Sequence, residues 1–349
     1  MIYSIQVLRG IAAFSVALIH AEALMYDYYG IDNMKAHASQ IFDDARSGVD
    51  LFFIISGFVM TYNFQRKHIS WTNFITGRII RIVPLYWALT IFLFSLFYLF
   101  PQLFSSLKVT SEQLFYSLFF IPNKLSPVIG IGWTLNFEIC FYIIFSLVFI
   151  LPRNVGPNVV WSIILLAVLA GASLELNNPI LRQITSPLLL EFLTGSIIAR
   201  FWFRKEFTSN LSYLVAGLGL FLIVLPIPGG RVFDWGIGCS MLVFGCIMLP
   251  KENLMNSSKI LILLGNISYS LYLVHDFALP AVGKLWFFLG LDSKFPMTFL
   301  PALALFVSIF CSSITYLLIE KYFTLFLKGK LSGSKPKSPK NAISTQPDY

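Results

Sequence analysis

Apolar runs of roughly twenty residues recur along the whole chain and are separated by short polar stretches. An α-helix needs about 20 such residues to cross a bilayer, where it satisfies its own backbone hydrogen bonds. The pattern therefore predicts an all-α, polytopic membrane helix bundle. Its ten predicted transmembrane helices cover residues 5–24, 47–64, 80–100, 134–151, 159–175, 184–202, 212–227, 233–249, 262–280 and 297–319. The apolar run 114–121 is too short to cross, and we interpret it as an interfacial or re-entrant piece.

The lysine and arginine positions predict the orientation in the membrane. With the N-terminus in the cytoplasm, sixteen of these residues fall in the inner loops and the tail, and eight fall in the outer loops. Cytoplasmic loops of membrane proteins carry the excess of positive charge. We therefore predict cytoplasmic N- and C-termini and an even number of spans.

The composition excludes an ordinary soluble enzyme. The chain is 57% hydrophobic and 12% charged, whereas soluble domains have about 45–50% apolar and about 25% charged residues. The net charge of +8 is accounted for by the inner loops and the tail, so it requires no nucleic-acid partner. We expect one membrane domain over residues 1–327 and a disordered, basic cytoplasmic tail over residues 328–349. The sequence carries no signal for an oligomeric state.

The cysteines give no sign of a metal site. All four lie within predicted spans, at Cys140, Cys239, Cys246 and Cys311, and their spacing fits no metal-binding pattern. We interpret them as small core residues, and we expect no metal cofactor.

The first predicted span carries two polar side chains, Arg9 and His20. Eleven steps of about 100° bring them to the same helix face, roughly 16 Å apart along the axis. Ionisable groups in a span usually face a cavity or a partner, which makes both residues candidates for function. Each residue also has a purely structural explanation. Arg9 could extend its side chain to the inner lipid headgroups, and His20 could be a hydrogen-bonded histidine at the membrane interface.

Two carboxylates are predicted at the depth of His20. Asp50 lies near the outer end of the second span, and Glu138 lies about a turn and a half inside the outer end of the fourth. A carboxylate beside an imidazole fixes its tautomer and stabilises its protonated form, as a general base requires. We therefore expect Asp50 and Glu138 to orient His20.

Two further arginines lie at the predicted cytoplasmic end of the third span. Arg78 and Arg81 are three residues apart and share a helix face. Arginine suits bidentate phosphate binding, so together with Arg9 they could form a phosphate site. The positive-inside rule alone also explains arginines at this position.

Six segments together resemble the acyltransferase-3 family of integral membrane acyltransferases. They are LRGIAAFSVALIH, SGVDLFFIISGF, RIIRIVPLYW, GWTLNFEICFY, NISYSLYLVH and YLLIEKYF, and they follow the family's order over residues 5 to 323. The beginning, SIQVLRGIAA, is similar to members that decorate bacterial exopolysaccharides. One departure is Tyr322, which follows Glu320 and Lys321 where the family often has proline.

The resemblance implies a multi-pass O-acyltransferase of the bacterial inner membrane. Its acyl donor would be cytoplasmic acetyl-CoA or a related acyl-CoA, and its acceptor a hydroxyl of a surface or exported glycan. The family's motif histidine falls on His20, its motif arginines on Arg9, Arg78 and Arg81, and its fourth-helix acid on Glu138. We interpret the arginines as the phosphate site for CoA and His20 as the general base, with Glu138 and Asp50 as its orienting acids. A covalent acyl-histidine intermediate remains an alternative.

Two other functions stay open at this point. A transporter or flippase for a glycan or a lipid-linked intermediate would also use intramembrane histidine and carboxylates, and a structural subunit of a polysaccharide assembly would not use them at all. Glu191 and the pair His275–Asp276 could line a tunnel. Tyr86 and Trp133 could stack on a sugar, although both lie where an interfacial aromatic belt is expected.

Overall fold

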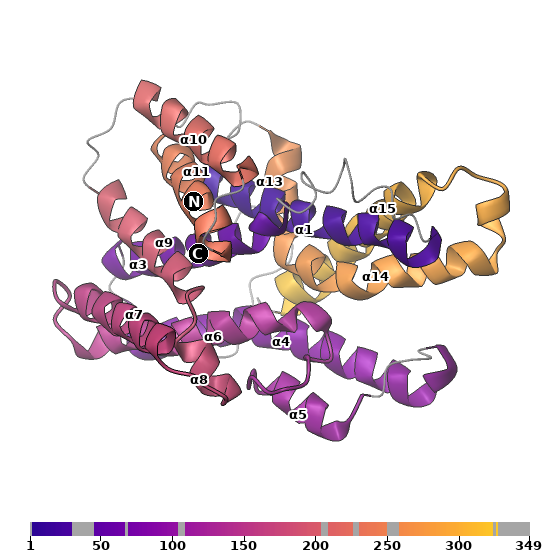
Figure 1. The fold of residues 1–349 in the computed structure, drawn as a ribbon, viewed down its shortest axis with the longest axis horizontal. Helices are drawn as coiled ribbons and strands as arrows, with labels where there is room; N and C mark the ends of the chain where they lie inside the picture. Colours follow the sequence, from indigo (N-terminus) through magenta and orange to yellow (C-terminus); the bar gives the residue numbers. More distant parts are fainter. Residues whose placement is uncertain are drawn as a thin grey trace.

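The computed structural model describes residues 2–29, 45–66, 69–103, 109–203, 209–225, 230–249, 258–323 and 326. Over these residues all the regular elements are helices, which confirms the predicted all-α architecture (Figure 1). The helices are α1 (Tyr3–Tyr29), α3 (Gly48–Arg66), α4 (Trp71–Leu99), α5 (Ser111–Leu118), α6 (Trp133–Ser146), α7 (Gly156–Ser173), α8 (Pro179–Ile184), α9 (Leu189–Trp202), α10 (Ser209–Val224), α11 (Ile237–Met248), α13 (Lys259–Asn266), α14 (Ser268–Phe288) and α15 (Phe299–Thr315). The predicted tail at 328–349 lies outside the described residues.

The apolar helices make this a multi-pass membrane protein. Among the described residues, six helical segments are long and apolar enough to cross a bilayer, and a seventh is counted if the bent pair α13–α14 is one span. Each of the ten predicted runs falls on a helix or a helix pair, but the count of ten is not confirmed. The apolar helices Asn210–Val224 and Val232–Met248 are shorter than the roughly 20 residues that a helix needs to cross a bilayer. The cytoplasmic position of the termini stays a prediction.

The predicted span 262–280 is not one straight helix. The structure ends α13 at Asn266 and starts α14 at Ser268, and the two axes differ by 68°. Gly265 and Asn266 are residue types that commonly end helices. The end of α13 is also held against α1, because Gln6 Nε2 donates to Asn266 Oδ1 at 2.8 Å.

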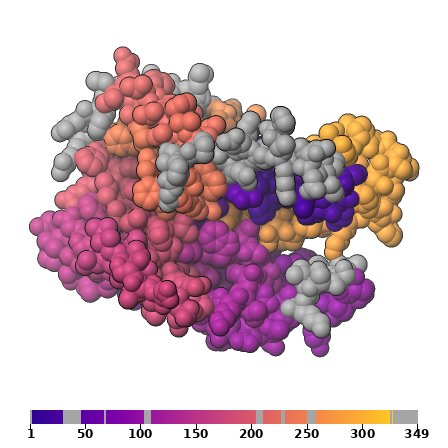
Figure 2. Space-filling view, viewed as in Figure 1, coloured from indigo at the N-terminus to yellow at the C-terminus, as the bar shows by residue number. Residues whose placement is uncertain are grey.

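The N-terminal helix α1 is the central element of the bundle. It packs against α3, α13, α14 and α15, and small buried residues on it, such as Ala13 and Ala17, allow close approach of these neighbours. Figure 2 shows α1 in indigo beside α14 and α15 in orange and yellow, with the segment of α4 to α9 forming the opposite side of the molecule. The polar face of α1 is thereby turned into the protein, away from lipid.

Two glycines set the distance between α3 and α9. A Cβ atom at Gly57 would lie 1.9 Å from the carbonyl oxygen of Phe192, and one at Gly195 would lie 1.8 Å from that of Ile54. The two backbones therefore touch directly, which is how small residues allow helices to associate in lipid. The contact holds the helix that carries Asp50 against the helix that carries Glu191.

We expect Gly57→Ala to destabilise the protein by about 1–3 kcal/mol, the usual cost of inserting atoms into a packed core. The matched control is Gly217→Ala on α10, where a Cβ atom would meet nothing within 4 Å. The unfolding temperature of the two variants in detergent tests this expectation. Equal unfolding temperatures for both variants and the wild type would contradict the close packing of α3 on α9.

Candidate functional site

A cavity of about 300 Å³ lies between α1, α3, α4, α6 and α14. This volume is at the lower end of the roughly 300–1,000 Å³ typical of ligand pockets. Its lining is unusually polar for the inside of a membrane bundle. The polar side chains at its wall are Gln6, Arg9, Ser56, Tyr62, Asn63, Arg66, Arg78, Arg81, Thr134, Glu138, Tyr142, Tyr269 and Tyr272. We call this space the arginine cavity.

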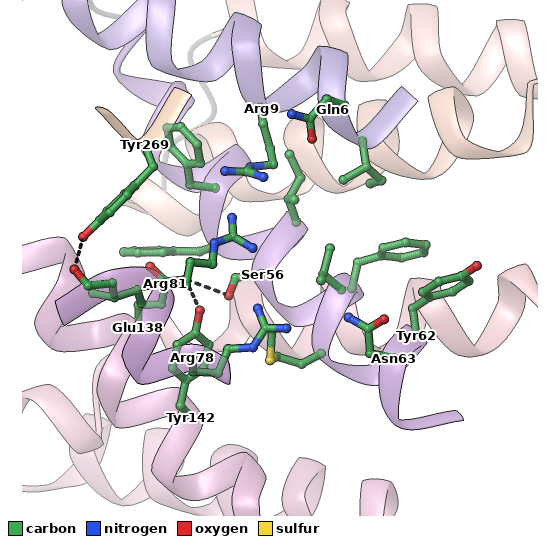
Figure 3. A pocket seen from close by; sticks show the side chains of 18 of the residues that line it. Gln6, Arg9, Ser56, Tyr62, Asn63, Arg78, Arg81, Glu138, Tyr142 and Tyr269 are labelled. Carbon is green, nitrogen blue, oxygen red and sulfur yellow. Dashed lines mark hydrogen bonds between the residues drawn. The ribbon is translucent and has the colours of Figure 1, made fainter. Parts of the chain in front are cut away.

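The three predicted arginines meet in this cavity. Figure 3 shows the guanidinium groups of Arg9, from α1, and of Arg78 and Arg81, from α4, pointing into one space. Arg9 is 6% exposed, and the Arg78 guanidinium lies 5.9 Å from the centre of the Tyr142 ring. Three positive charges in a largely buried site need anionic groups to balance them, from the protein or from a ligand.

Arg78 and Arg81 lie deeper in their helix than the sequence predicted. The expected span began at residue 80, but α4 begins at Trp71, where the Ser70 side chain accepts a hydrogen bond from the Asn73 backbone N–H at 3.3 Å. Serine is a preferred residue before the first turn of a helix. Both arginines therefore lie about two to three turns inside a continuous helix, and they face the bundle interior.

Glu138 faces the arginine cavity. Its carboxylate accepts hydrogen bonds from Ser56 Oγ at 3.3 Å and from the Tyr142 hydroxyl (Figure 3). The expectation that it orients His20 is therefore corrected, because depth along a helix does not specify the side of the helix. The structure instead gives Glu138 the position of an anion that balances the arginines.

A second carboxylate approaches the same arginines from the C-terminal end of the fold. Glu320, in the short π-helical segment Tyr316–Phe323, accepts a hydrogen bond from Ser270 Oγ at 2.8 Å. It lies within electrostatic range of Arg81 and Arg9. Four arginines, Arg66 among them, and one carboxylate, Glu138, therefore line the cavity. Even with Glu320 in electrostatic range of Arg81 and Arg9, positive charge is left in excess for an anionic ligand.

Asp50 belongs to a different cluster and is not beside His20. It is fully buried and accepts two hydrogen bonds from Arg231, from Nε at 3.1 Å and from Nη2 at 2.8 Å. Glu191 is also buried and lies in electrostatic range of this pair. The two acids and Arg231 connect α3, α9 and the segment before α11. The prediction missed this ion pair because 181 residues separate its partners in the chain.

His20 has its neighbours on α14. Its ring packs edge-on against that of His275, with 5.0 Å between ring centres. His275 is fully buried, and its Nδ1 lies 2.9 Å from the Leu271 carbonyl oxygen. Asp276, the next residue, is in electrostatic range of His20, and its Oδ2 accepts a hydrogen bond from the Gly130 N–H at 2.9 Å. The acid that can stabilise a protonated His20 is therefore Asp276.

Tyr272 connects the arginine cavity to the histidines. It lines the cavity, and its ring centre lies 5.9 Å from that of His275. Its hydroxyl forms a hydrogen bond of 2.9 Å with Thr134, which lines the cavity as well. The arginines and His20 are thus the two ends of one polar region that follows α1 through the bundle.

Sequence reasoning did not identify the tyrosines and serines that complete this region. Tyr142 lies one helical turn after Glu138, so its spacing was a usable signal. Tyr269 donates to the Ile82 carbonyl at 2.8 Å and joins α14 to α4 across the cavity. Within the part of the chain that the structure describes, no group of three or more His, Cys, Asp or Glu side chains could hold a metal ion.

Comparisons with known proteins support the resemblance to the acyltransferase-3 family along most of the chain. The acyltransferase domain that defines the acyltransferase-3 family matches residues 2–318. The exopolysaccharide production protein ExoZ of Rhizobium meliloti (strain 1021) is 34% identical over 262 residues, which cover 72% of this chain and 82% of ExoZ.

Two other relatives are more distant. ORF330 of Acidianus two-tailed virus, whose name includes the word acetyltransferase, is 25% identical over 314 residues, with 84% of this chain and 88% of the relative covered. An uncharacterized protein of Haemophilus influenzae is 27% identical over 236 residues, which cover 59% of this chain and 89% of that protein. No solved structure matches the chain. Because the family match spans nearly the whole sequence, the chain belongs to the acyltransferase-3 family.

Proposed function

We propose that this membrane acyltransferase is an O-acetyltransferase that uses cytoplasmic acetyl-CoA to modify a surface or exported polysaccharide in a bacterial inner membrane. The observation that supports it best is the polar region that joins three arginines to His20 across the bundle. A phosphate-binding end and a basic imidazole end are what a transfer from a phosphorylated donor to a hydroxyl requires. The similarity to ExoZ favours a polysaccharide as acceptor.

The arginine cavity would hold the donor. CoA carries several phosphate groups, and arginine binds phosphate through paired, charge-assisted hydrogen bonds. Glu138 and Glu320 limit the repulsion among Arg9, Arg78 and Arg81 before the donor binds. The slender acyl-bearing arm of CoA would extend past Tyr272 toward His20.

The histidine end would carry out the transfer. His20 takes the proton from a sugar hydroxyl while the hydroxyl oxygen attacks the thioester carbonyl carbon. When the carbon–sulfur bond breaks, the CoA thiolate leaves and takes the proton back from the imidazolium. General-base help of this kind typically contributes about 10²–10⁴-fold to the rate. Asp276 acts as a positioning residue that stabilises the imidazolium.

Purified protein in lipid nanodiscs tests this proposal directly. We expect it to transfer radiolabelled acetyl groups from acetyl-CoA to the deacylated surface polysaccharide of the producing cell, through a bond that mild base cleaves. Glycan movement across vesicles without any acyl donor, together with no labelled product, would instead favour a transporter.

We expect Asp276→Asn to lower kcat by about ten- to hundredfold, the range for losing a charge-assisted interaction of about 1.5–3 kcal/mol. Asparagine keeps an oxygen for the Gly130 N–H, so the local fold remains. Since Asp276 acts through His20, KM for both substrates stays near the wild-type value. An unchanged kcat, or a change in KM alone, contradicts the positioning role.

A further inference from the structure

A second polar space lies outside the arginine cavity. It is an open groove of about 880 Å³ between the segment that follows α5, the first turns of α6 and the short helix α8. In the predicted topology these parts follow the outer end of α4 and precede the outer end of α9, so the groove opens to the outside. We call it the outer groove. Its lining includes Lys124, Gly130, Trp133, Asn136, Arg182 and Gln183.

One buried side chain in the outer groove lacks a hydrogen-bond partner. Asn136 is 6% exposed, and among the described residues its Oδ1 atom has no partner. Its backbone is held in place, because Gln183 Nε2 donates to the Asn136 carbonyl at 2.9 Å. Buried polar atoms are nearly always paired, and an exception calls for an explanation. Because Asn136 lines the groove, a rotation of its side chain on sugar binding would bring this oxygen to a sugar hydroxyl, which supplies the missing donor.

The charge of the outer groove has one sign. Its described lining includes the exposed cations Lys124 and Arg182 and no carboxylate. The Arg182 Nε atom donates to the Leu176 carbonyl at 2.5 Å, which orients the rest of the guanidinium. Amide side chains together with an oriented arginine suit a sugar that carries a carboxylate group. The half-buried Trp133 adds an aromatic surface at the α6 wall.

The outer groove reaches the backbone that holds Asp276. Gly130 lines the groove, and its N–H donates to Asp276, the acid in electrostatic range of His20. The first turns of α6 separate the groove from the arginine cavity. Trp133 and Asn136 line the groove on one side of this helix, while Thr134 and Glu138 line the cavity on the other. The two sites thus lie on opposite sides of α6. The cavity borders the histidines through Tyr272, and the groove borders Asp276 through Gly130.

We propose that the outer groove is the acceptor site and that it binds a carboxylate-bearing segment of the polysaccharide, with one hydroxyl directed toward His20. This inference rests on the proposed acetyl transfer and specifies its second substrate. The carboxylate pairs with Arg182 and Lys124, and Asn136 accepts a hydrogen bond from a neighbouring sugar hydroxyl. The donor enters from the arginine cavity, so the two substrates do not compete for space.

The test uses the full protein in lipid nanodiscs with saturating acetyl-CoA. The acceptor is the producing cell's own surface polysaccharide, deacylated with mild base and cut to oligosaccharides. A second batch has its carboxylates chemically reduced to alcohols. The variants are Lys124→Gln with Arg182→Gln, and separately Asn136→Leu. Lys294→Gln is the matched control, an exposed cation outside the groove.

We expect the Lys124→Gln, Arg182→Gln variant to raise KM for the native oligosaccharides by about tenfold or more, because charge-assisted contacts are lost. Carboxylate reduction should raise the wild-type KM to the same extent, and the variant should not distinguish the two batches. The affinity of the double variant for acetyl-CoA should equal that of the wild type. Asn136→Leu should raise KM for both batches, while Lys294→Gln should behave as wild type.

Three results would overturn the acceptor site. One is an unchanged KM in the Lys124→Gln, Arg182→Gln variant of an active protein, which leaves the proposed function intact. Another is a producing cell whose acetylated polysaccharide carries no carboxylate. The third is a wild-type protein that transfers no acetyl group to either batch, which would overturn the proposed function as well. Because the two cations are exposed, loss of folding does not obscure the outcome.

Discussion

Replacing His20 by alanine is expected to lower polysaccharide acetylation by about 10²–10⁴-fold, the contribution typical of a general base. The methyl group of alanine cannot accept the proton of the sugar hydroxyl, so the hydroxyl remains a weak nucleophile. Proton NMR of the surface polysaccharide before and after mild base measures this directly. The strains to compare are a deletion strain and the same strain carrying the wild type or His20→Ala.

The donor site provides the control for this variant. His20 lies about 16 Å along α1 from Arg9, so acetyl-CoA should bind His20→Ala with wild-type affinity. Wild-type acetylation by His20→Ala would eliminate His20 as the base. An acetyl group found on His20 by mass spectrometry, when acceptor is absent, would replace direct transfer by an acyl-histidine intermediate.

Changing both Arg78 and Arg81 to glutamine is expected to weaken acetyl-CoA binding by about a hundredfold or more. Each change removes a charge-assisted hydrogen bond to phosphate, worth about 1.5–3 kcal/mol. Glutamine retains much of the length of the side chain and keeps a donor, which limits any repacking of α4 against Tyr142. Isothermal titration of acetyl-CoA into the purified protein measures the loss of affinity.

Two variants make this result specific to the cavity. Arg200→Gln on α9 removes an arginine that binds Asn158 and does not line the arginine cavity, so it should bind the donor as the wild type does. The double lysine variant, Arg78→Lys and Arg81→Lys, keeps the charge but loses the planar fork, and it should bind with intermediate affinity. Equal affinity in the glutamine variant and the wild type would move the donor site elsewhere.

The polar side chains inside the bundle show which features could be predicted from the sequence and which could not. The shared face of Arg9 and His20 followed from helical periodicity, and both do face the polar region inside the bundle. The same reasoning placed Asp50 and Glu138 at the depth of His20, but it could not choose their partners. In the structure, Asp50 accepts hydrogen bonds from Arg231. Glu138 accepts hydrogen bonds from Ser56 and Tyr142.

The sequence by itself determined that the chain is a helical membrane protein, because about twenty apolar residues in a row have one stable form in lipid. It also determined which side chains are too polar to face lipid, among them Arg9, His20 and Arg81. Only the tertiary structure decided that His275 and Asp276 of α14 adjoin His20, and that α6 separates the arginine cavity from the outer groove. The physical reason is that periodicity orients a side chain about its own helix, whereas its partner depends on contacts such as Gly57 on Phe192, which join segments far apart in the chain.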